Sequence, residues 1–300
     1  MSSKILQEAV ETLRSGELIG LPTETVYGLA CDATNGVAVA KIYQRKQRPS
    51  FNPLIIHVSD IAMAQEYGTF SSAALKLADH YWPGPVTMVV PGKGKVSELV
   101  SAGLETIGIR MPNHQVARHI IKDLGRPIAA PSANVSGFLS PTAADHVKQS
   151  FPDLLVLDGG PTDVGLESTI VDMSTAQPAI LRAGVITEEQ VEAVLGPLAA
   201  AAEGIKAPGQ LLRHYATNLP LRMDADVPQK GEAFLGFGDG PATQNLSQSG
   251  DLLEAAANLF KMLHILDDSD KYAGIAVARI PDTGVGVAIN DRLRRASERE

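Results

Sequence analysis

Cysteine is nearly absent from this chain of 300 residues, because Cys31 is the only one. An internal disulfide therefore cannot form, and a metal cluster held by several cysteines is excluded. The chain also lacks a His-x-x-x-His pair, a glycine-rich loop with P-loop spacing, and the nucleophile elbow of the α/β-hydrolases. We therefore predict no metal site and no chemistry based on an activated serine of that kind.

Long apolar runs and an excess of basic residues are also missing. No stretch approaches the roughly 18 apolar residues that cross a bilayer, and the N-terminus lacks the basic-then-apolar pattern of a signal peptide. We therefore expect a cytoplasmic protein that makes no membrane contact. Acidic residues outnumber basic ones by 34 to 26, which gives a formal net charge of −8. This disfavours a broad nucleic-acid-binding face, although a local basic patch is compatible with it.

What the chain does have is a succession of short apolar runs separated by helical patterns. Several of the expected strands follow one another without a helix, which favours an α/β fold with a twisted mixed sheet. The runs expected to be strands are 18–21, 54–58, 86–90, 106–110, 127–130, 154–157, 168–171 and 179–181. The helices are expected over 3–15, 35–46, 72–80, 114–123, 142–149 and 187–196.

The end of the chain reads as a second, smaller α/β unit. A stretch with Pro-Gly punctuation at 206–215 has the composition of a linker. After it we expect strands at 234–237 and 275–280, a helix at about 251–266 and a final helix that ends in 292–295. We therefore divide the chain into a larger domain over 1–207, a linker over 208–219 and a small C-terminal domain over 220–300.

Short polar islands lie directly against the expected strands. Ligand sites in α/β folds gather where strand ends meet loops, so these islands predict one composite pocket. Their cations, hydroxyls and amides suit an anionic substrate, and they offer little acid–base machinery. The islands are 22–28, 46–54, 110–112, 131–134 and 167–169.

Lys46 is the most unusual residue of these islands. At 100° per residue it lies on the apolar stripe of its helix, with Val39, Ile42 and Tyr43. One interpretation is a lysine at a helix end whose ammonium reaches solvent and complements the helix dipole. The other is a cation that points into a cleft beside Arg48. Arginine can grip a phosphate through two donors, whereas lysine acts as a compact charge.

The other polar residues each allow a structural interpretation as well. Ser132 and Asn134 follow a strand, where Ser-x-Asn is common turn chemistry. The hydroxyl of Thr25 could tie down a turn. Arg110 ends a strand and could bind a carboxylate or form a surface ion pair. His57 could be a hydrogen-bonded histidine of the core.

Taken together, the islands resemble the YrdC-type threonylcarbamoyl-AMP synthases. The resemblance covers residues 1 to about 207 in order, and the linker APGQLLRHYA with a small C-terminal domain is similar to the long, two-domain form. The segments that carry it are PTETVYGL (22–29), KQRPSFNPLIIHV (46–58), YWPGPVTMV (81–89), IGIRMPNH (107–114), PIAAPSAN (127–134), SPT (140–142), ESTIVD (167–172) and ILRAG (180–184).

The resemblance implies a fold and a set of site residues. The fold is a YrdC-like domain with a concave basic cleft. The family's characteristic Lys-x-Arg and Ser-x-Asn pairs, expected to act in catalysis, fall on Lys46, Arg48, Ser132 and Asn134. Its ATP-contacting positions fall on Arg48, Asn52, Thr106, Ser132, Ser140 and Arg182. Its threonine-contacting positions fall on Thr25, His57, Arg110, Ala130 and Ser168. Its linker suggests lid residues at Arg213, His214 and Tyr215.

The reaction that the resemblance implies joins L-threonine, bicarbonate or CO2, and ATP to give threonylcarbamoyl-AMP and pyrophosphate. ATP is then a substrate with Mg2+, and no organic prosthetic group is expected. The expected partner downstream is the tRNA threonylcarbamoyl transferase complex, and a weak contact with tRNA is left open. The chain departs from the family at Leu212, where a tyrosine is usual, and at Thr217, where a proline is usual.

Two other functions compete with this one. A YrdC-like domain could hold RNA in its cleft without catalysis, but the acidic net charge disfavours this and leaves the amino-acid positions unexplained. A related carbamoyl-adenylate enzyme of metal-cofactor maturation would carry zinc-finger-like cysteines, which this chain lacks.

Overall fold

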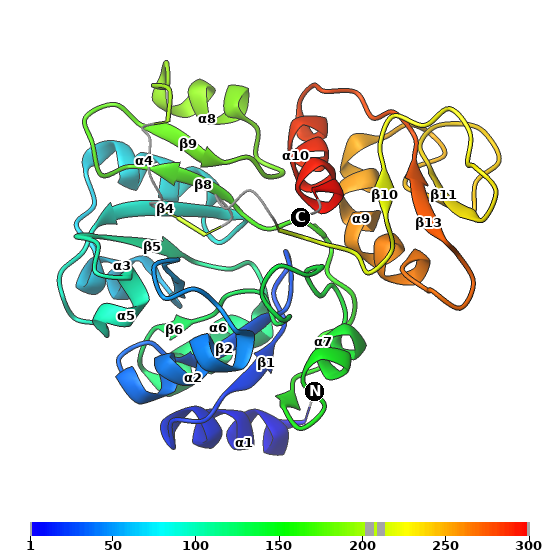
Figure 1. Cartoon of the computed structure of the whole chain (residues 1–300). Coiled ribbons are helices and arrows are strands. Elements are labelled where there is room, and N and C mark those ends of the chain that lie inside the picture. Colours follow the sequence, from blue (N-terminus) through cyan, green and yellow to red (C-terminus); the bar gives the residue numbers. More distant parts are fainter. Residues whose placement is uncertain (1, 202–206, 209–213, 299–300) are drawn as a thin grey trace.

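The computed structural model describes residues 2–201, 207–208 and 214–298. Within this part, the larger domain is built on one mixed sheet of nine strands in the spatial order β7-β1-β2-β6-β3-β5-β4-β8-β9 (Figure 1). The pairs β1/β7, β3/β5 and β4/β8 are parallel and the other neighbours are antiparallel. The strands are β1 Ile19–Leu21, β2 Gly28–Asp32, β3 Ile55–His57, β4 Val86–Pro91, β5 Thr106–Arg110, β6 Ile128–Ala129, β7 Leu155–Val156, β8 Thr169–Asp172 and β9 Ala179–Arg182. The predicted mixed α/β sheet is confirmed.

Helices bury the sheet on both faces. On β2, Leu29 and Cys31 belong to one apolar cluster and Ala30 between them belongs to another, because alternate side chains of a strand point to opposite faces. α1 packs on α6, and α4 packs on α8. The helices are α1 Ser3–Arg14, α2 Gly36–Lys46, α3 Ile61–Tyr67, α4 Ser72–Tyr81, α5 Glu98–Ser101, α6 Gln115–Leu124, α7 Ala144–Ser150 and α8 Glu188–Leu195. No helix in the described ranges is long and apolar enough to span a bilayer.

The ends of α2 explain where its cations lie. The Asn35 side chain caps the first turn by accepting hydrogen bonds from the backbone N–H groups of Val37 and Ala38. The helix stops because Gln47 adopts the left-handed conformation, with φ at 53°. The chain therefore turns between Lys46 and Arg48, and the two cations leave the helix end in different directions.

Three elements of this domain, β2, α3 and α5, are absent from the sequence-based prediction. β2 was not predicted because its residues, GLACD, include none of the β-branched or aromatic side chains that favour strands. Its strand conformation comes from pairing with β1 on one side and β6 on the other. The short helices α3 and α5 were also missed, and α5 is a single turn capped by Ser97.

The C-terminal domain is the predicted small α/β unit. Its four strands are all parallel, in the order β10-β13-β11-β12 among the residues described. Its elements are β10 Leu221–Arg222, β11 Glu232–Gly236, β12 Gln244–Asn245, α9 Leu252–Leu266, β13 Gly274–Val277 and α10 Val285–Ser297. Figure 1 shows α9 and α10 on the side of this sheet that faces the larger domain.

The two domains share an apolar core. Val26 and Leu166 of the larger domain cluster with Leu259 of α9 and Ile289 of α10. Gly165 makes this packing possible, because a Cβ there would lie 2.5 Å from the carbonyl oxygen of Ala257 in α9. The segments that carry Val26 and Leu166 also carry polar islands, so the C-terminal domain lies directly behind the predicted pocket.

Candidate active site

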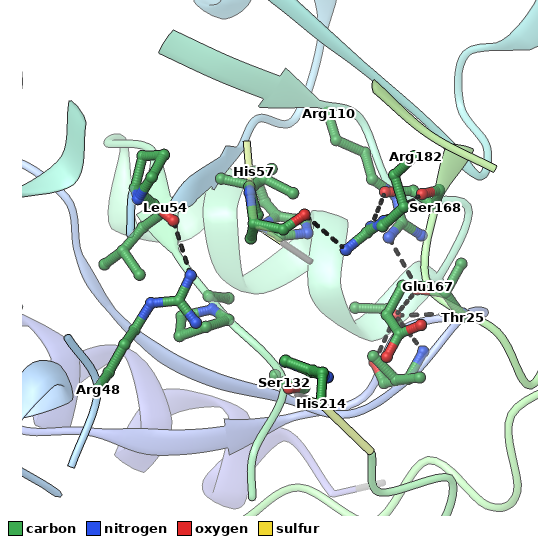
Figure 2. A pocket seen from close by; sticks show the side chains of 18 of the residues that line it. Thr25, Arg48, Leu54, His57, Arg110, Ser132, Glu167, Ser168, Arg182 and His214 are labelled. Atoms are coloured by element: carbon green, nitrogen blue, oxygen red, sulfur yellow. Dashed lines mark hydrogen bonds between the residues drawn. The ribbon is translucent and has the colours of Figure 1, made fainter. Parts of the chain in front are cut away.

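The polar islands meet at one cavity at the strand ends of the larger domain (Figure 2). In Figure 2, Arg48 lies on one side of the hollow, and Arg110, Arg182 and Ser168 lie on the opposite side. The prediction that separate islands form one pocket is therefore consistent with the structure. The lining residues are Thr23, Thr25, Val26, Gly28, Arg48, Pro53, Leu54, Ile55, His57, Arg110, Ala130, Pro131, Ser132, Glu167, Ser168, Arg182, Pro208, His214 and Tyr215.

Arg110 is buried at the end of β5 and is not a surface residue. Its Nη1 donates to the Thr25 hydroxyl at 2.7 Å, and its Nε donates to the Gly84 carbonyl oxygen at 3.2 Å. Its Nη2 lies 2.8 Å from Glu24 Oε1, but the two groups are not aligned as a hydrogen bond. Arg110 is thus half of an ion pair, but the pair is buried, so only the surface location of that interpretation is wrong. The guanidinium keeps hydrogen-bonding capacity at Nη2 and faces the cavity.

Arg182 and Ser168 form a second polar wall. Arg182 ends β9, and its Nη2 donates to the Ser168 carbonyl at 2.8 Å and to the Ser168 hydroxyl at 3.1 Å. The Ser168 hydroxyl also lies 2.7 Å from the Thr87 hydroxyl. Burial lowers the pKa of Arg182 to about 10. The guanidinium therefore remains charged at neutral pH.

Arg48 supplies the cation on the opposite side of the cavity. Its Nε donates to the Asn52 carbonyl at 3.1 Å and its Nη2 to the Pro53 carbonyl at 2.9 Å. Burial lowers the pKa of Arg48 to about 10, so it too stays charged. These carbonyl bonds fix the side chain before any ligand is present, as charge stabilisation by a preorganised group requires.

Lys46 is as buried as its helical stripe predicts, with 1% of its surface exposed. The alternative of an ammonium that reaches solvent is therefore wrong. Its Nζ donates to the backbone carbonyls of Ser132 and Asn134, at 2.6 and 2.5 Å, and the side chain is not among those that line the cavity. Burial, and then the charge of Arg48, lower the pKa of Lys46. In this structure Lys46 holds the 132–134 loop, and its catalytic role stays a prediction.

Two neutral histidines complete the wall. Burial lowers the pKa of His57 to about 3, with a further contribution from the charge of Arg110. Burial also lowers the pKa of His214 to about 3, against the opposing effect of Glu167. In both rings Nδ1 has no hydrogen-bond partner among the described residues. Both imidazoles are therefore uncharged at neutral pH, and neither acts there as a cation for phosphate.

Not all of the predicted site residues line the cavity. Thr106 begins β5, at the opposite end of the strand from Arg110. Asn134 is buried, and its amide donates to the carbonyls of Val135 and Phe138, which is the turn chemistry of the structural interpretation. The ATP roles of Asn52, Thr106 and Ser140 and the role of Asn134 stay predictions, because none of these residues is among those that line the cavity.

The linker contributes to the cavity. Pro208, His214 and Tyr215 line it, and the rings of His214 and Tyr215 meet edge to face with centroids 4.0 Å apart. The other predicted lid residue, Arg213, lies outside the described residues, as does Leu212. The lid function stays a prediction.

The site prediction left out one acidic residue on the cavity wall. Glu167 is buried there, and its Oε1 accepts a hydrogen bond from the Ser140 hydroxyl at 2.5 Å. It stands in the island with Ser168, so its position was a usable signal. Its partner, Arg292, lies 125 residues further along the chain.

Comparison with known proteins decides the family. Residues 11–184 match the Sua5/YciO/YrdC family model, described as "Telomere recombination", and residues 186–298 match the model described as "Threonylcarbamoyl-AMP synthase, C-terminal domain". The chain is 38% identical to the threonylcarbamoyl-AMP synthase of Bacillus subtilis, over 97% of this chain and 92% of that one. It belongs to the threonylcarbamoyl-AMP synthase family.

A second relative supports the same assignment across both domains. The threonylcarbamoyl-AMP synthase of Pyrococcus abyssi is 35% identical over 95% of this chain and 92% of its own length. The crystal structure of P. abyssi Sua5 complexed with L-threonine superposes with a TM-score of 0.89, at 34% identity, and covers 97% of this chain and 94% of that one. The predicted family and its two-domain form are therefore confirmed, and the chain is an enzyme of the nucleotidyltransferase type.

Proposed function

We propose that the chain makes threonylcarbamoyl-AMP and pyrophosphate from L-threonine, bicarbonate or CO2, and ATP, for the threonylcarbamoyladenosine modification of tRNA. The observation that carries this proposal is the buried cavity in which Arg48, Arg110 and Arg182 converge with the hydroxyls of Thr25 and Ser168. Three guanidiniums suit a substrate set with a triphosphate and a carboxylate. The two hydroxyls suit a small amino acid that itself carries a hydroxyl.

The chemistry asks for positioning more than for a protein base. The threonine amine adds to CO2 and loses a proton, which gives an N-carboxylate. One oxygen of that carboxylate forms a bond to the α-phosphorus of ATP while the bond to pyrophosphate breaks. Such transfers depend on alignment and on neutralisation of charge. Arg48 and Arg182 are assigned to the phosphates because their hydrogen bonds to carbonyls hold them in place.

Arg110, Thr25 and Ser168 are assigned to threonine. Arg110 already binds the Thr25 hydroxyl, so a carboxylate on Nη2 would lie beside a fixed hydroxyl. Serine should then be a poorer substrate because it lacks the methyl group, and valine poorer still because it brings no hydroxyl to the polar groups around Thr25 and Ser168. His57 and Ala130 are assigned to the same pocket as lining residues.

Mg2+ fits this site only together with its substrate. The described residues contain no group of three or more His, Cys, Asp or Glu side chains that could hold a metal. Glu167 lines the cavity and Glu24 precedes the lining residue Thr25, and both carboxylates are paired with arginines. Mg2+ commonly binds through substrate phosphates with few protein ligands. In this proposal it enters as part of Mg–ATP, and its chemistry is to neutralise phosphate charge.

The domain boundaries, the cellular location and the partners of the chain are part of the same proposal. The division into 1–207, 208–219 and 220–300 is supported by the two sheets, although the family models meet near residue 185 and α8 packs on α4 of the larger domain. A cytoplasmic location and delivery of the product to a tRNA threonylcarbamoyl transferase complex follow from the proposed reaction. A weak contact with tRNA remains part of the hypothesis.

Exchange of labelled pyrophosphate into ATP tests the function. We expect exchange that requires both threonine and bicarbonate, and that falls about tenfold or more in Arg182→Gln. Arg126→Gln is the matched control, because Arg126 is half exposed, pairs with Asp32 and does not line the cavity. Exchange that ignores threonine would contradict the proposal. Binding of RNA without any exchange would support the non-catalytic alternative instead.

A further inference from the structure

Arg292 lies in the middle of α10, yet its side chain is fully buried against the larger domain. Its Nε is 3.2 Å from Glu167 Oε2, and its Nη1 is 3.0 Å from Asp291 Oδ2. Its Cζ lies 5.5 Å from the centre of the Tyr215 ring. One guanidinium of the C-terminal domain therefore contacts two residues that line the candidate active site.

The contact of Arg292 with Glu167 neutralises a negative charge in the cavity wall. Burial would raise the pKa of Glu167, but the charges of Arg292 and Arg182 and the hydrogen bond from Ser140 outweigh it and lower the pKa to about 2. A full negative charge thus lies in the wall of a cavity assigned to a triphosphate. Removing one partner of a buried ion pair leaves the other uncompensated. Arg292 compensates this charge from outside the cavity.

The contact between Arg292 and Glu167 also leaves Arg182 free to keep its bonds to Ser168 and its position for phosphate. The Arg182 guanidinium is close enough to Glu167 to influence its pKa, but it donates to the Ser168 carbonyl and hydroxyl. After Arg292, the cation that acts most strongly on the Glu167 carboxylate among the described residues is Arg182. Moving to Glu167 would take Arg182 away from Ser168 and from the phosphate position.

The contact with Tyr215 fixes the linker. Tyr215 has φ at 65°, a left-handed conformation that a bulky residue keeps only where its surroundings hold it. Its ring packs on Phe260 of α9, with centroids 5.3 Å apart, and under the Arg292 guanidinium. Both supports come from the C-terminal domain.

We propose that Arg292 is a positioning residue of the active site, which acts through Glu167 and Tyr215 and makes the C-terminal domain part of the ATP site. The inference rests on the proposed function. Loss of Arg292 should weaken the binding of ATP more than the binding of threonine, because an uncompensated Glu167 carboxylate repels a polyanion more strongly than a zwitterion.

The test uses the full chain and compares Arg292→Met, Arg292→Lys, Glu167→Gln and the double variant Glu167→Gln/Arg292→Met. We expect Arg292→Met to raise the KM for Mg–ATP about tenfold or more and the KM for threonine less than about threefold. The double variant should return to within about threefold of Glu167→Gln, because no buried charge is then left unpaired. Arg292→Lys should fall between wild type and Arg292→Met, because lysine restores the charge without the two-donor geometry.

A pH comparison separates positioning from a merely structural role. The titratable, charged and hydrogen-bonding groups that face Glu167 are Arg292, Arg182, His214, Tyr215 and the Ser140 hydroxyl. Without Arg292 the pKa of Glu167 rises, so at lower pH more of it is protonated and uncharged. The ATP defect of Arg292→Met, measured against wild type at the same pH, should therefore be smaller at about pH 6 than at about pH 8.

The matched control is Asn290→Ala, on the same helix. Asn290 is buried and donates to the Ile280 carbonyl and to Asp282, all within the C-terminal domain. The Asn290→Ala variant should have a lower Tm but an unchanged KM for Mg–ATP and for threonine. If Arg292→Met behaves in the same way, or if Glu167→Gln does not relieve it, the inference is wrong.

Two further measurements keep the outcome decisive. If Arg292→Met does not fold, Arg292→Lys and the double variant carry the comparison. Calorimetric titration with Mg–ATP measures the same effect without turnover. If wild type shows no threonine-dependent exchange, the proposed function fails. In that case a higher Kd for Mg–ATP in Arg292→Lys than in wild type would still support the inference, and an unchanged Kd would overturn it.

Discussion

The two neutral histidines of the cavity should make the stability of this enzyme fall in mild acid. His57 and His214 are 4% and 9% exposed, and burial lowers the pKa of each to about 3. In the unfolded chain a histidine has a pKa of about 6.5. Between these values the unfolded state binds more protons than the folded state, so the free energy of unfolding falls as the pH falls.

The size of the effect follows from those values. Relative to about pH 7.5, each histidine should remove about 2 kcal/mol of stability at about pH 5, and the two together about 4 kcal/mol. This is a large share of the roughly 5–15 kcal/mol by which proteins are stable. The depressed pKa of Glu167 acts in the same direction but only below its unfolded value of 4.5, so it adds little in this window.

Urea unfolding at the two pH values measures the change in the free energy of unfolding. The fluorescence of Trp82, the single tryptophan, reports the transition. His57→Gln should reduce the pH-dependent loss by about 2 kcal/mol, the share calculated for His57. His80→Gln is the matched control, because His80 is exposed on α4, and it should leave the loss unchanged. An equal free energy of unfolding at both pH values, or equal behaviour of the two variants, would refute the argument.

Three further outcomes are expected. Arg48→Ala should lower pyrophosphate exchange about tenfold, about 1.4 kcal/mol of barrier, with an unchanged circular dichroism spectrum; a wild-type rate at saturating substrates would contradict its role. Thr25→Val should raise the KM for threonine about tenfold and narrow the preference of threonine over valine, as competition assays would show; an unchanged preference would remove Thr25 from the pocket. Gly165→Ala should lower Tm by several degrees, because a Cβ at φ of 72° would lie 2.5 Å from the Ala257 carbonyl; an unchanged Tm in a thermal scan would contradict the close packing of the two domains.

The arrangement also explains why so few acid–base groups are present. The described lining of the cavity holds two histidines whose pKa values are lowered to about 3, and one carboxylate, Glu167, that is already paired with Arg292, so this lining offers no strong base at neutral pH. A reaction that runs on alignment and charge balance does not need one. The charges are balanced in pairs, Arg110 with Glu24 and Arg292 with Glu167, and Arg48 and Arg182 are the cations that the proposed function assigns to the phosphates.

Local sequence pattern carried much of the prediction. Apolar runs with helical or strand-like spacing predict the α/β fold, because burial of one face or of both faces is written into consecutive residues. Lys46 shows the strength of this reasoning, since its place on an apolar stripe indicated burial correctly. Arg292 follows the same pattern with Val285, Ala288, Ile289 and Ala296 on α10. The same test applied to the last helix would have singled it out.

Tertiary structure decided the partners. Lys46 reaches carbonyls 86 and 88 residues away, and Arg292 reaches a carboxylate 125 residues away, and no local period encodes such pairings. β2 is a strand because β1 and β6 pair with it, although its small residues favour no strand by themselves. The sequence alone thus determined which segments are buried and which polar islands end them, because those properties depend on neighbours along the chain. Only the folded chain decided which charges neutralise one another around the cavity, because that depends on distances between segments that the sheet and the domain interface bring together.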